Sequence, residues 1–175
     1  MMSLKMQAAS GILKTIMIGE ADAGRQNTLC RIIRGDQDLQ KVAGQRTTQF
    51  HLNKNITITL FTNSSNDSEL NLLYLGAQII LVVFDVSRRK TLNKALAQFQ
   101  ATKKNYCGKH AQLLLIAHRI GNGPREVTPE EGEKTALKCD MMYMEVDAEK
   151  TTQKELWNKL IELGEKYLFV LAQNE

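Results

Sequence analysis

Residues 74–95 of this 175-residue chain read YLGAQIILVVFDVSRRKTLNKA. Within this stretch, Ile79–Val86 is an apolar run broken only by Asp85, and such runs are typical of a central strand covered on both faces. Apolar residues then recur at the spacing of an amphipathic helix, at Leu92, Ala95, Leu96 and Phe99. A buried strand that runs straight into a helix favours an α/β fold with a mostly parallel sheet.

The alternation of strands and helices continues in both directions from this stretch. Apolar or alternating patterns predict further strands at Ile12–Ile18, Thr47–Leu52, Ile56–Phe61, Leu113–Ala117 and Tyr143–Val146. The short link at residues 53–55 predicts an antiparallel hairpin between the second and third strands. Helices are predicted at Asn27–Arg34, from Thr128 onward, where Glu131 completes a capping box, and over Leu156–Leu168.

The composition is that of one globular domain. Hydrophobic residues make up 43% of the chain and charged residues 24%, and the length suits a single core. The longest apolar run, Ile79–Phe84, is far shorter than the ~18–20 residues of a membrane span. The N-terminus lacks the apolar stretch of a signal peptide, so the sequence predicts a cytoplasmic protein.

Metal-binding and nucleic-acid-binding patterns are missing from the sequence. The net charge of +4 is mild, and the lysines and arginines are spread along the chain without a basic stripe or aromatic interleaving. No nucleic-acid partner is therefore expected, while an acidic partner surface stays open. Neither the cysteines, which predict free thiols, nor the histidines have metal-ligand spacing: Cys30, Cys107, Cys139, His51, His110 and His118.

Most of the chain resembles the Ras/Rab small GTPase family. Residues 74–95 are similar to the family's Y-x-G-A helix end, its strand closing in Y/F-D-V and its Ser/Thr-rich helix start. Residues 125–162, REVTPEEGEKTALKCDMMYMEVDAEKTTQKELWNKLIE, resemble its last helix, strand and helix, and residues 14–33 resemble its front. The resemblance implies a three-layer α/β/α G domain over residues 11–173, after an extension of residues 1–10. Its sheet would be mixed and six-stranded, mostly parallel with one antiparallel edge hairpin, and accompanied by about five helices.

The family's phosphate-binding motif, G-x-x-x-x-G-K-[ST], is only partly retained. Gly19 and Gly24 keep its spacing, so a loop of backbone N–H groups that cradles phosphate stays open. Arg25 replaces the lysine, and a planar guanidinium does not substitute for a compact ammonium threaded between phosphates. Gln26 replaces the hydroxyl that binds Mg²⁺. The residual phosphate loop would consist of Gly19, Asp22, Ala23, Gly24, Arg25, Gln26 and Asn27.

The metal-linked and base-reading motifs are also altered. In the motif D-x-x-G followed by Gln, Thr62 replaces the aspartate, Ser65 the glycine and Asn66 the glutamine. These replacements remove the carboxylate that supports Mg²⁺ and change the side chain whose amide orients the attacking water. The base-reading motif N-K-x-D aligns with residues 118–121, where the altered positions are His118, Arg119 and Gly121. Glycine has no side chain to accept hydrogen bonds from a guanine ring.

These changes predict a pseudo-GTPase, which is a non-catalytic module that binds proteins in signalling or membrane traffic. No cofactor, metal site or catalytic residue is expected, and GTP hydrolysis should be absent or very weak. Protein partners are expected at the positions of the family's effector-binding switches: Thr47, Thr48, Phe50, Phe61, Leu70, Leu73 and Tyr74. The alternative is an atypical Rab-type protein that binds GTP or GDP weakly, with or without Mg²⁺, and hydrolyses GTP very slowly.

A flavodoxin-like or receiver domain, with Asp85 as a phospho-acceptor, is a third interpretation that the expected hairpin disfavours. The last residues, FVLAQNE, contain no cysteine for prenylation. No membrane anchor in this chain is therefore expected, and a partner would recruit it to membranes. The sequence leaves open that the chain is part of a tandem or larger protein.

Overall fold

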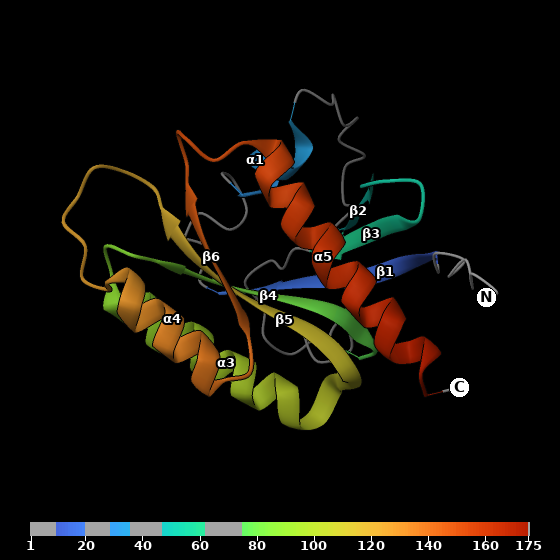
Figure 1. Ribbon diagram of the computed structural model, residues 1–175. Helices are drawn as coiled ribbons and strands as arrows, with labels where there is room; N and C mark the ends of the chain where they lie inside the picture. The colour runs from blue at the N-terminus through green and yellow to red at the C-terminus, as the bar shows by residue number, and fades with distance from the viewer. Residues whose placement is uncertain (1–9, 20–28, 36–46, 62–74, 175) are drawn as a thin grey trace, which may run out of the picture.

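A mixed six-stranded sheet forms the centre of the computed structural model, which describes residues 10–19, 29–35, 47–61 and 75–174 (Figure 1). The strands are ordered β2-β3-β1-β4-β5-β6. β2 is antiparallel to β3, and every other neighbouring pair is parallel, which confirms the predicted sheet with its edge hairpin. The strand bounds are Gly11–Ile18 (β1), Thr47–His51 (β2), Ile56–Phe61 (β3), Ala77–Asp85 (β4), Cys107–Arg119 (β5) and Met142–Asp147 (β6).

Helices cover both faces of the sheet, which gives the three layers of the predicted fold. α1 and α5 lie on one face, and α3 and α4 lie on the other (Figure 1). Four helices lie within the described part of the chain: Cys30–Arg34 (α1), Arg89–Tyr106 (α3), Pro129–Lys138 (α4) and Gln153–Ala172 (α5).

β4 divides its side chains between the two layers, because successive residues of a strand point to opposite faces. One cluster, under α1 and α5, takes Ile79, Leu81 and Val83, which are fully buried. The other, under α3 and α4, takes Ile80, Val82 and Phe84. The unbroken apolar run over residues 79–84 of β4 is therefore what a central strand with two covered faces requires.

The start of α5 is fastened to the end of α1. Thr152 and Glu155 form a capping box at the first turn of α5. From the first two turns of α5, Gln153 Nε2 and Trp157 Nε1 both donate to the Ile33 carbonyl oxygen, at 3.0 and 2.8 Å. These bonds join residues more than a hundred positions apart in the sequence, so α5 helps to fix where α1 ends.

β5 is longer than predicted. It starts at Cys107, directly after α3, whereas the apolar run predicts a strand only over Leu113–Ala117. Residues 107–112 read CGKHAQ, which has neither an apolar run nor a regular alternation. They follow β4 through a register shift between Ala77 and Ile79, and it is this neighbour that makes them a strand.

Candidate functional site

The chemically informative residues gather at one edge of the sheet, where the parallel strands end. Gly19 follows β1, and Asp85 and Arg119 end β4 and β5. The strand register places Asp85 beside His118 and Arg119 beside Asp147, the last residue of β6. In open α/β sheets, ligands bind outside this carboxyl edge. The edge is therefore the candidate site.

Gly19 is required at this edge by its contact with β4. Its φ is +138°, in a region that favours glycine, and an added Cβ would lie 2.2 Å from the Val83 backbone oxygen. No side chain fits there, because Val83 is itself fully buried in the central strand. Close approach of two backbones accounts for this glycine without a bound phosphate.

The loop after β5 folds back on itself. His118 is fully buried, and Arg119 Nε donates to the Gly121 carbonyl oxygen at 3.2 Å. The hollow at this position has a volume of about 10 Å³ and is lined by Arg119, Ile120, Gly121, Asn122, Asp147, Ala148 and Glu149. That volume holds about one water molecule, whereas pockets for small ligands measure ~300–1,000 Å³. The described residues thus form no cavity for a nucleobase here.

The carboxylates at this edge accept hydrogen bonds from residues of the turns in which they lie. Ser87 donates its backbone N–H and its hydroxyl to Asp85 Oδ1, at 2.9 and 2.7 Å, and Arg88 Nε donates to Oδ2 at 2.9 Å. Burial alone would raise the pKa of Asp85, but these hydrogen bonds outweigh it and hold the pKa below its ordinary value. Asp147 Oδ1 likewise accepts from the Glu149 backbone at 3.0 Å. Asp85 therefore has a structural role in this turn. The antiparallel β2 contradicts the receiver-type sheet in which Asp85 would be a phospho-acceptor.

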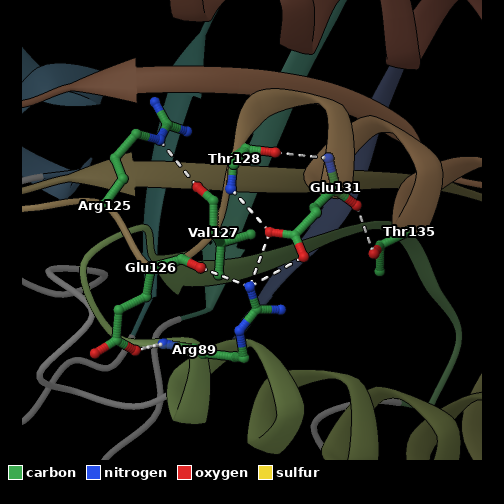
Figure 2. Close-up of polar contacts among 7 residues, drawn as sticks. All are labelled: Arg89, Arg125, Glu126, Val127, Thr128, Glu131 and Thr135. Carbon is green, nitrogen blue, oxygen red and sulfur yellow. Dashed lines mark hydrogen bonds and ion pairs between the residues drawn. The ribbon is translucent and has the colours of Figure 1, made fainter.

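Ion pairs hold the segment between β5 and α4 against α3 and β6. The Arg89 side chain donates to the Glu126 carbonyl oxygen at 2.6 Å and to both Glu131 oxygens at 2.8 and 3.0 Å (Figure 2). On the other side of the segment, Arg125 binds Glu145 through two nitrogens, and Tyr143 donates to the same carboxylate at 2.8 Å. The hydrogen bonds from Arg125 lower the pKa of Glu145 below its ordinary value. Sequence reasoning missed these pairs, because no local pattern joins positions 20 or 42 residues apart.

The helix start inside this segment is as predicted. Thr128 accepts from the Glu131 backbone N–H, and Glu131 accepts from the Thr128 backbone N–H, which together form the capping box (Figure 2). The same Glu131 carboxylate binds Arg89, so one side chain both caps α4 and joins it to α3.

Comparison with known proteins identifies the family to which this chain belongs. The model of the Ras family matches residues 14–165. This chain belongs to the Ras family. The Ras-related protein Rab-18 of Lymnaea stagnalis is 27% identical over 145 residues, which cover 78% of this chain and 71% of that protein. Rab-18-B of Danio rerio is also 27% identical over 145 residues, covering 78% and 70%, and RABA2c of Arabidopsis thaliana is 25% identical over 170 residues, covering 89% and 75%.

The partner surface predicted for this Ras-family chain is only partly described by the structure. Thr47 and Thr48 lie in β2, as expected, and Thr48 is partly exposed. Phe61 is partly buried against the core, with Lys14 Nζ 5.2 Å from its ring centre. The prediction for Phe50 is wrong, because its side chain is 2% exposed and lies in the core cluster under α1 and α5.

Several predicted site residues lie outside the described parts of this Ras-family chain. The structure describes only Gly19 of the residual phosphate loop, but it describes all four residues of the base-reading motif. The residues outside are Asp22, Ala23, Gly24, Arg25, Gln26, Asn27, Thr62, Ser65, Asn66, Leu70, Leu73 and Tyr74. Within the described ranges, no helix has the length and hydropathy needed to cross a membrane, and no cluster of His, Cys, Asp and Glu could hold a metal ion.

Proposed function

We propose that this Ras-family chain is a pseudo-GTPase, a protein-binding module that neither needs nor hydrolyses a guanine nucleotide. Its partners would be proteins that act in signalling or membrane traffic, bound at the switch-equivalent surface that includes Thr48 and Phe61. Binding would be constitutive, because a surface without a nucleotide to sense has no ligand to shift it between states. The protein would be cytoplasmic and reach membranes through its partners.

The base-reading end of the site carries this proposal. Gly121 stands where the family's motif has the carboxylate that accepts from guanine, and the hollow beside it is about 10 Å³. Arg119, at the lysine position of the motif, donates to the Gly121 carbonyl oxygen. A guanine ring therefore finds neither its acceptor nor its space among the described residues, and these residues do not fit the nucleotide that the family implies.

The sequence adds support at the phosphate and metal positions. Gln26 and Thr62 stand where the family has a hydroxyl and a carboxylate that hold Mg²⁺. Phosphoryl transfer in this family relies on positioning and on charge stabilisation by the metal. Loss of a single preorganised group typically slows such a reaction by about 10²–10³, and several are replaced here.

The alternative, an atypical Rab-type protein with weak nucleotide binding, rests on Gly19, Gly24 and the positive charge of Arg25. Gly19 gives it little support, since the Val83 oxygen requires a glycine there in any case. The two functions differ in one measurable property, which is the affinity for guanine nucleotides and its dependence on Mg²⁺.

Fluorescent GTP and GDP analogues should be titrated against the purified protein in Mg²⁺ and in EDTA. We expect dissociation constants no tighter than about 10⁻⁴ M that Mg²⁺ does not improve. Nanomolar binding that EDTA abolishes would contradict the proposal.

A Gly121→Asp variant, which restores the base acceptor, serves as the matched comparison. Under the proposal it binds GDP no better than the wild type, because the phosphate and metal positions remain altered. A gain of tenfold or more in GDP affinity, without a gain for ADP, would show that a working phosphate loop persists and would favour the alternative.

A further inference from the structure

A hollow of about 260 Å³ lies where β6 begins, at the edge of the sheet opposite the candidate site. It adjoins residues 111–113 of β5, which have no partner in β6 because that pairing begins at Leu114 and Met142. The end of α4 contributes Leu137 and Asp140 to the lining, and α5 contributes Lys166. Pockets that enclose small ligands measure ~300–1,000 Å³, so this hollow is a depression of the surface and not a cofactor cavity.

Two exposed apolar side chains border the hollow. Leu137, in the last turn of α4, is 81% exposed. Phe169 of α5 is 50% exposed and stands one helical turn after Lys166, about 60° around the helix axis and therefore on the same side. The two helices cover opposite faces of the sheet, and the edge strand β6 lies between them (Figure 1). Single exposed apolar side chains are ordinary, but these two accompany unpaired charges.

The charges of Asp140 and Lys166 are both unsatisfied within the described part of the chain. The structure gives neither side chain a hydrogen bond or an ion pair with a described residue. By contrast, Lys159, earlier on α5, pairs with Glu162 at 2.7 Å. One carboxylate and one ammonium thus border the same hollow, from different elements, without neutralising each other.

The turn that holds Asp140 does not need its carboxylate. The Asp140 N–H bonds to the Leu137 carbonyl oxygen at 3.2 Å, and the next N–H, of Met141, bonds to the Ala136 oxygen at 2.9 Å. This is the helix-ending turn in which glycine is usual, and Asp140 has a φ of +57° there. It is the one non-glycine residue with a positive φ in the described ranges. The fold alone would favour glycine, so the carboxylate calls for another explanation.

We propose that this surface binds a second copy of the chain, across a twofold axis that passes through the hollow. In such an interface the same patch faces itself, so that each contact occurs twice. Asp140 would meet Lys166 of the partner subunit, and Leu137 would meet Phe169 of the partner subunit. The α4 side of the patch carries an acid and an apolar group, and the α5 side carries a base and an apolar group. The patch is therefore complementary to itself in both charge and hydrophobicity.

The same four side chains disfavour other occupants. A small zwitterion would neutralise both charges but leave Leu137 and Phe169 in water. A nucleic acid or an anionic bilayer would meet the Asp140 carboxylate with like charge. A different protein would have to supply all four complementary groups, which a second copy always carries. The contact area is small, so the dimer belongs to the weak class of complexes, and it lies away from the base-reading residues on which the proposed function rests.

Sedimentation velocity of the full chain, from about 10 μM to 1 mM, measures this dimer. Lys166→Glu and Asp140→Lys each create a like-charge pair with the partner subunit, whereas the double variant restores opposite charges and keeps the net charge of the wild type. Lys154→Glu is the matched control. It makes the same change in charge at an exposed position of α5, about 18 Å along the helix from Lys166. Asp140→Gly removes the carboxylate from a turn that glycine suits, in case lysine impairs folding there.

We expect a wild-type dissociation constant of roughly 10⁻⁴ M, which rises with added salt and is unchanged in Lys154→Glu. Each single reversal should weaken the dimer at least about tenfold, since every reversal acts twice in the interface. The double variant should return to within about threefold of the wild type. Asp140→Gly should also weaken the dimer, and circular dichroism should show that every variant is folded.

Three results would overturn the inference. A wild type that stays monomeric up to about 1 mM would leave this surface to a different protein or to a small zwitterion. A double variant as weak as the single reversals would exclude the pairing of Asp140 with Lys166 of the partner subunit. An equal loss in Lys154→Glu would show that net charge, and not this patch, controls association.

Discussion

Replacement of Gly19 by alanine separates the role of this residue in folding from a role in phosphate binding. The added Cβ would lie 2.2 Å from the Val83 oxygen and 3.2 Å from its carbonyl carbon. Neither atom can retreat, because Val83 is a fully buried residue of β4, which pairs with β1 on one side and β5 on the other. The backbone at Gly19 has a φ of +138°, which an alanine rarely adopts.

The loss of folding stability in Gly19→Ala follows from two separate effects. Overpacking a closely packed site costs about 1–3 kcal/mol, and holding a residue with a side chain in a sparsely populated φ region costs about 1–3 kcal/mol. Their sum is roughly 2–6 kcal/mol, against a total stability of about 5–15 kcal/mol for a domain of this size. A urea midpoint should therefore fall by about 1 M or more.

Urea unfolding followed by circular dichroism, without any nucleotide, measures this change. Gly121→Ala is the matched control at the same edge of the sheet, since no atom lies within 4 Å of its added Cβ, and it should change the free energy of unfolding by less than about 0.5 kcal/mol. If Gly19→Ala is as harmless as Gly121→Ala, the contact with Val83 does not explain the glycine. Phosphate binding would then be the better explanation for the glycine at this position.

Three further predictions concern the contacts around the site. Gly132→Ala should destabilise the protein by about 1–2 kcal/mol despite the better helix propensity of alanine, because the added Cβ would meet the Tyr143 ring and hydroxyl at 2.5–2.7 Å. This loss of stability should shrink when Tyr143→Leu is present in both proteins that are compared. An unchanged loss would exclude the Tyr143 ring as its cause. Glu145 has a lowered pKa because Arg125 donates to it, so its stabilisation is complete above the unfolded carboxyl pKa of about 4.3 and is lost as pH falls through the folded value. The stability difference between wild type and Glu145→Gln, from thermal unfolding, should accordingly shrink as pH falls below about 5 and through the lowered pKa of the folded state, and a constant difference would refute the assignment. Trp157→Phe removes the bond to the Ile33 oxygen and should cost about 1 kcal/mol in urea unfolding, whereas no loss would mean that the bond from Gln153 suffices.

Strands and helices could be predicted where the burial of one or both of their faces produces a regular pattern of apolar residues in the sequence. The apolar run of β4 and the capping box at Thr128 correspond directly to observed elements. The first part of β5 could not be predicted, since CGKHAQ becomes a strand only through its pairing with β4. Phe50 was misplaced for an avoidable reason, because Phe50 and Leu52 alternate with polar Gln49 and His51, which predicts an inward side chain.

The candidate site was harder to predict than the fold. Gly19 and Gly121 could be placed by motif spacing, but the contact of Gly19 with Val83 depends on how two strands lie side by side. The same applies to Arg89 and Glu131, which stand 42 residues apart and meet only because α3 and α4 share one face of the sheet. Motif spacing shows which residues differ from the family's motif. The structural reason for a residue that matches the motif, such as Gly19, lies in contacts between segments that are distant in the sequence.

The covering of one sheet face by α5 has a consequence for biosynthesis. Leu156, Leu160 and Leu163 close the core over β1, β3 and β4, yet they belong to a helix that follows all six strands in the sequence. While synthesis pauses before residue 153, strands made much earlier still present an apolar face to water and to chaperones. A nascent chain of this protein thus stays vulnerable to aggregation until α5 has left the exit tunnel.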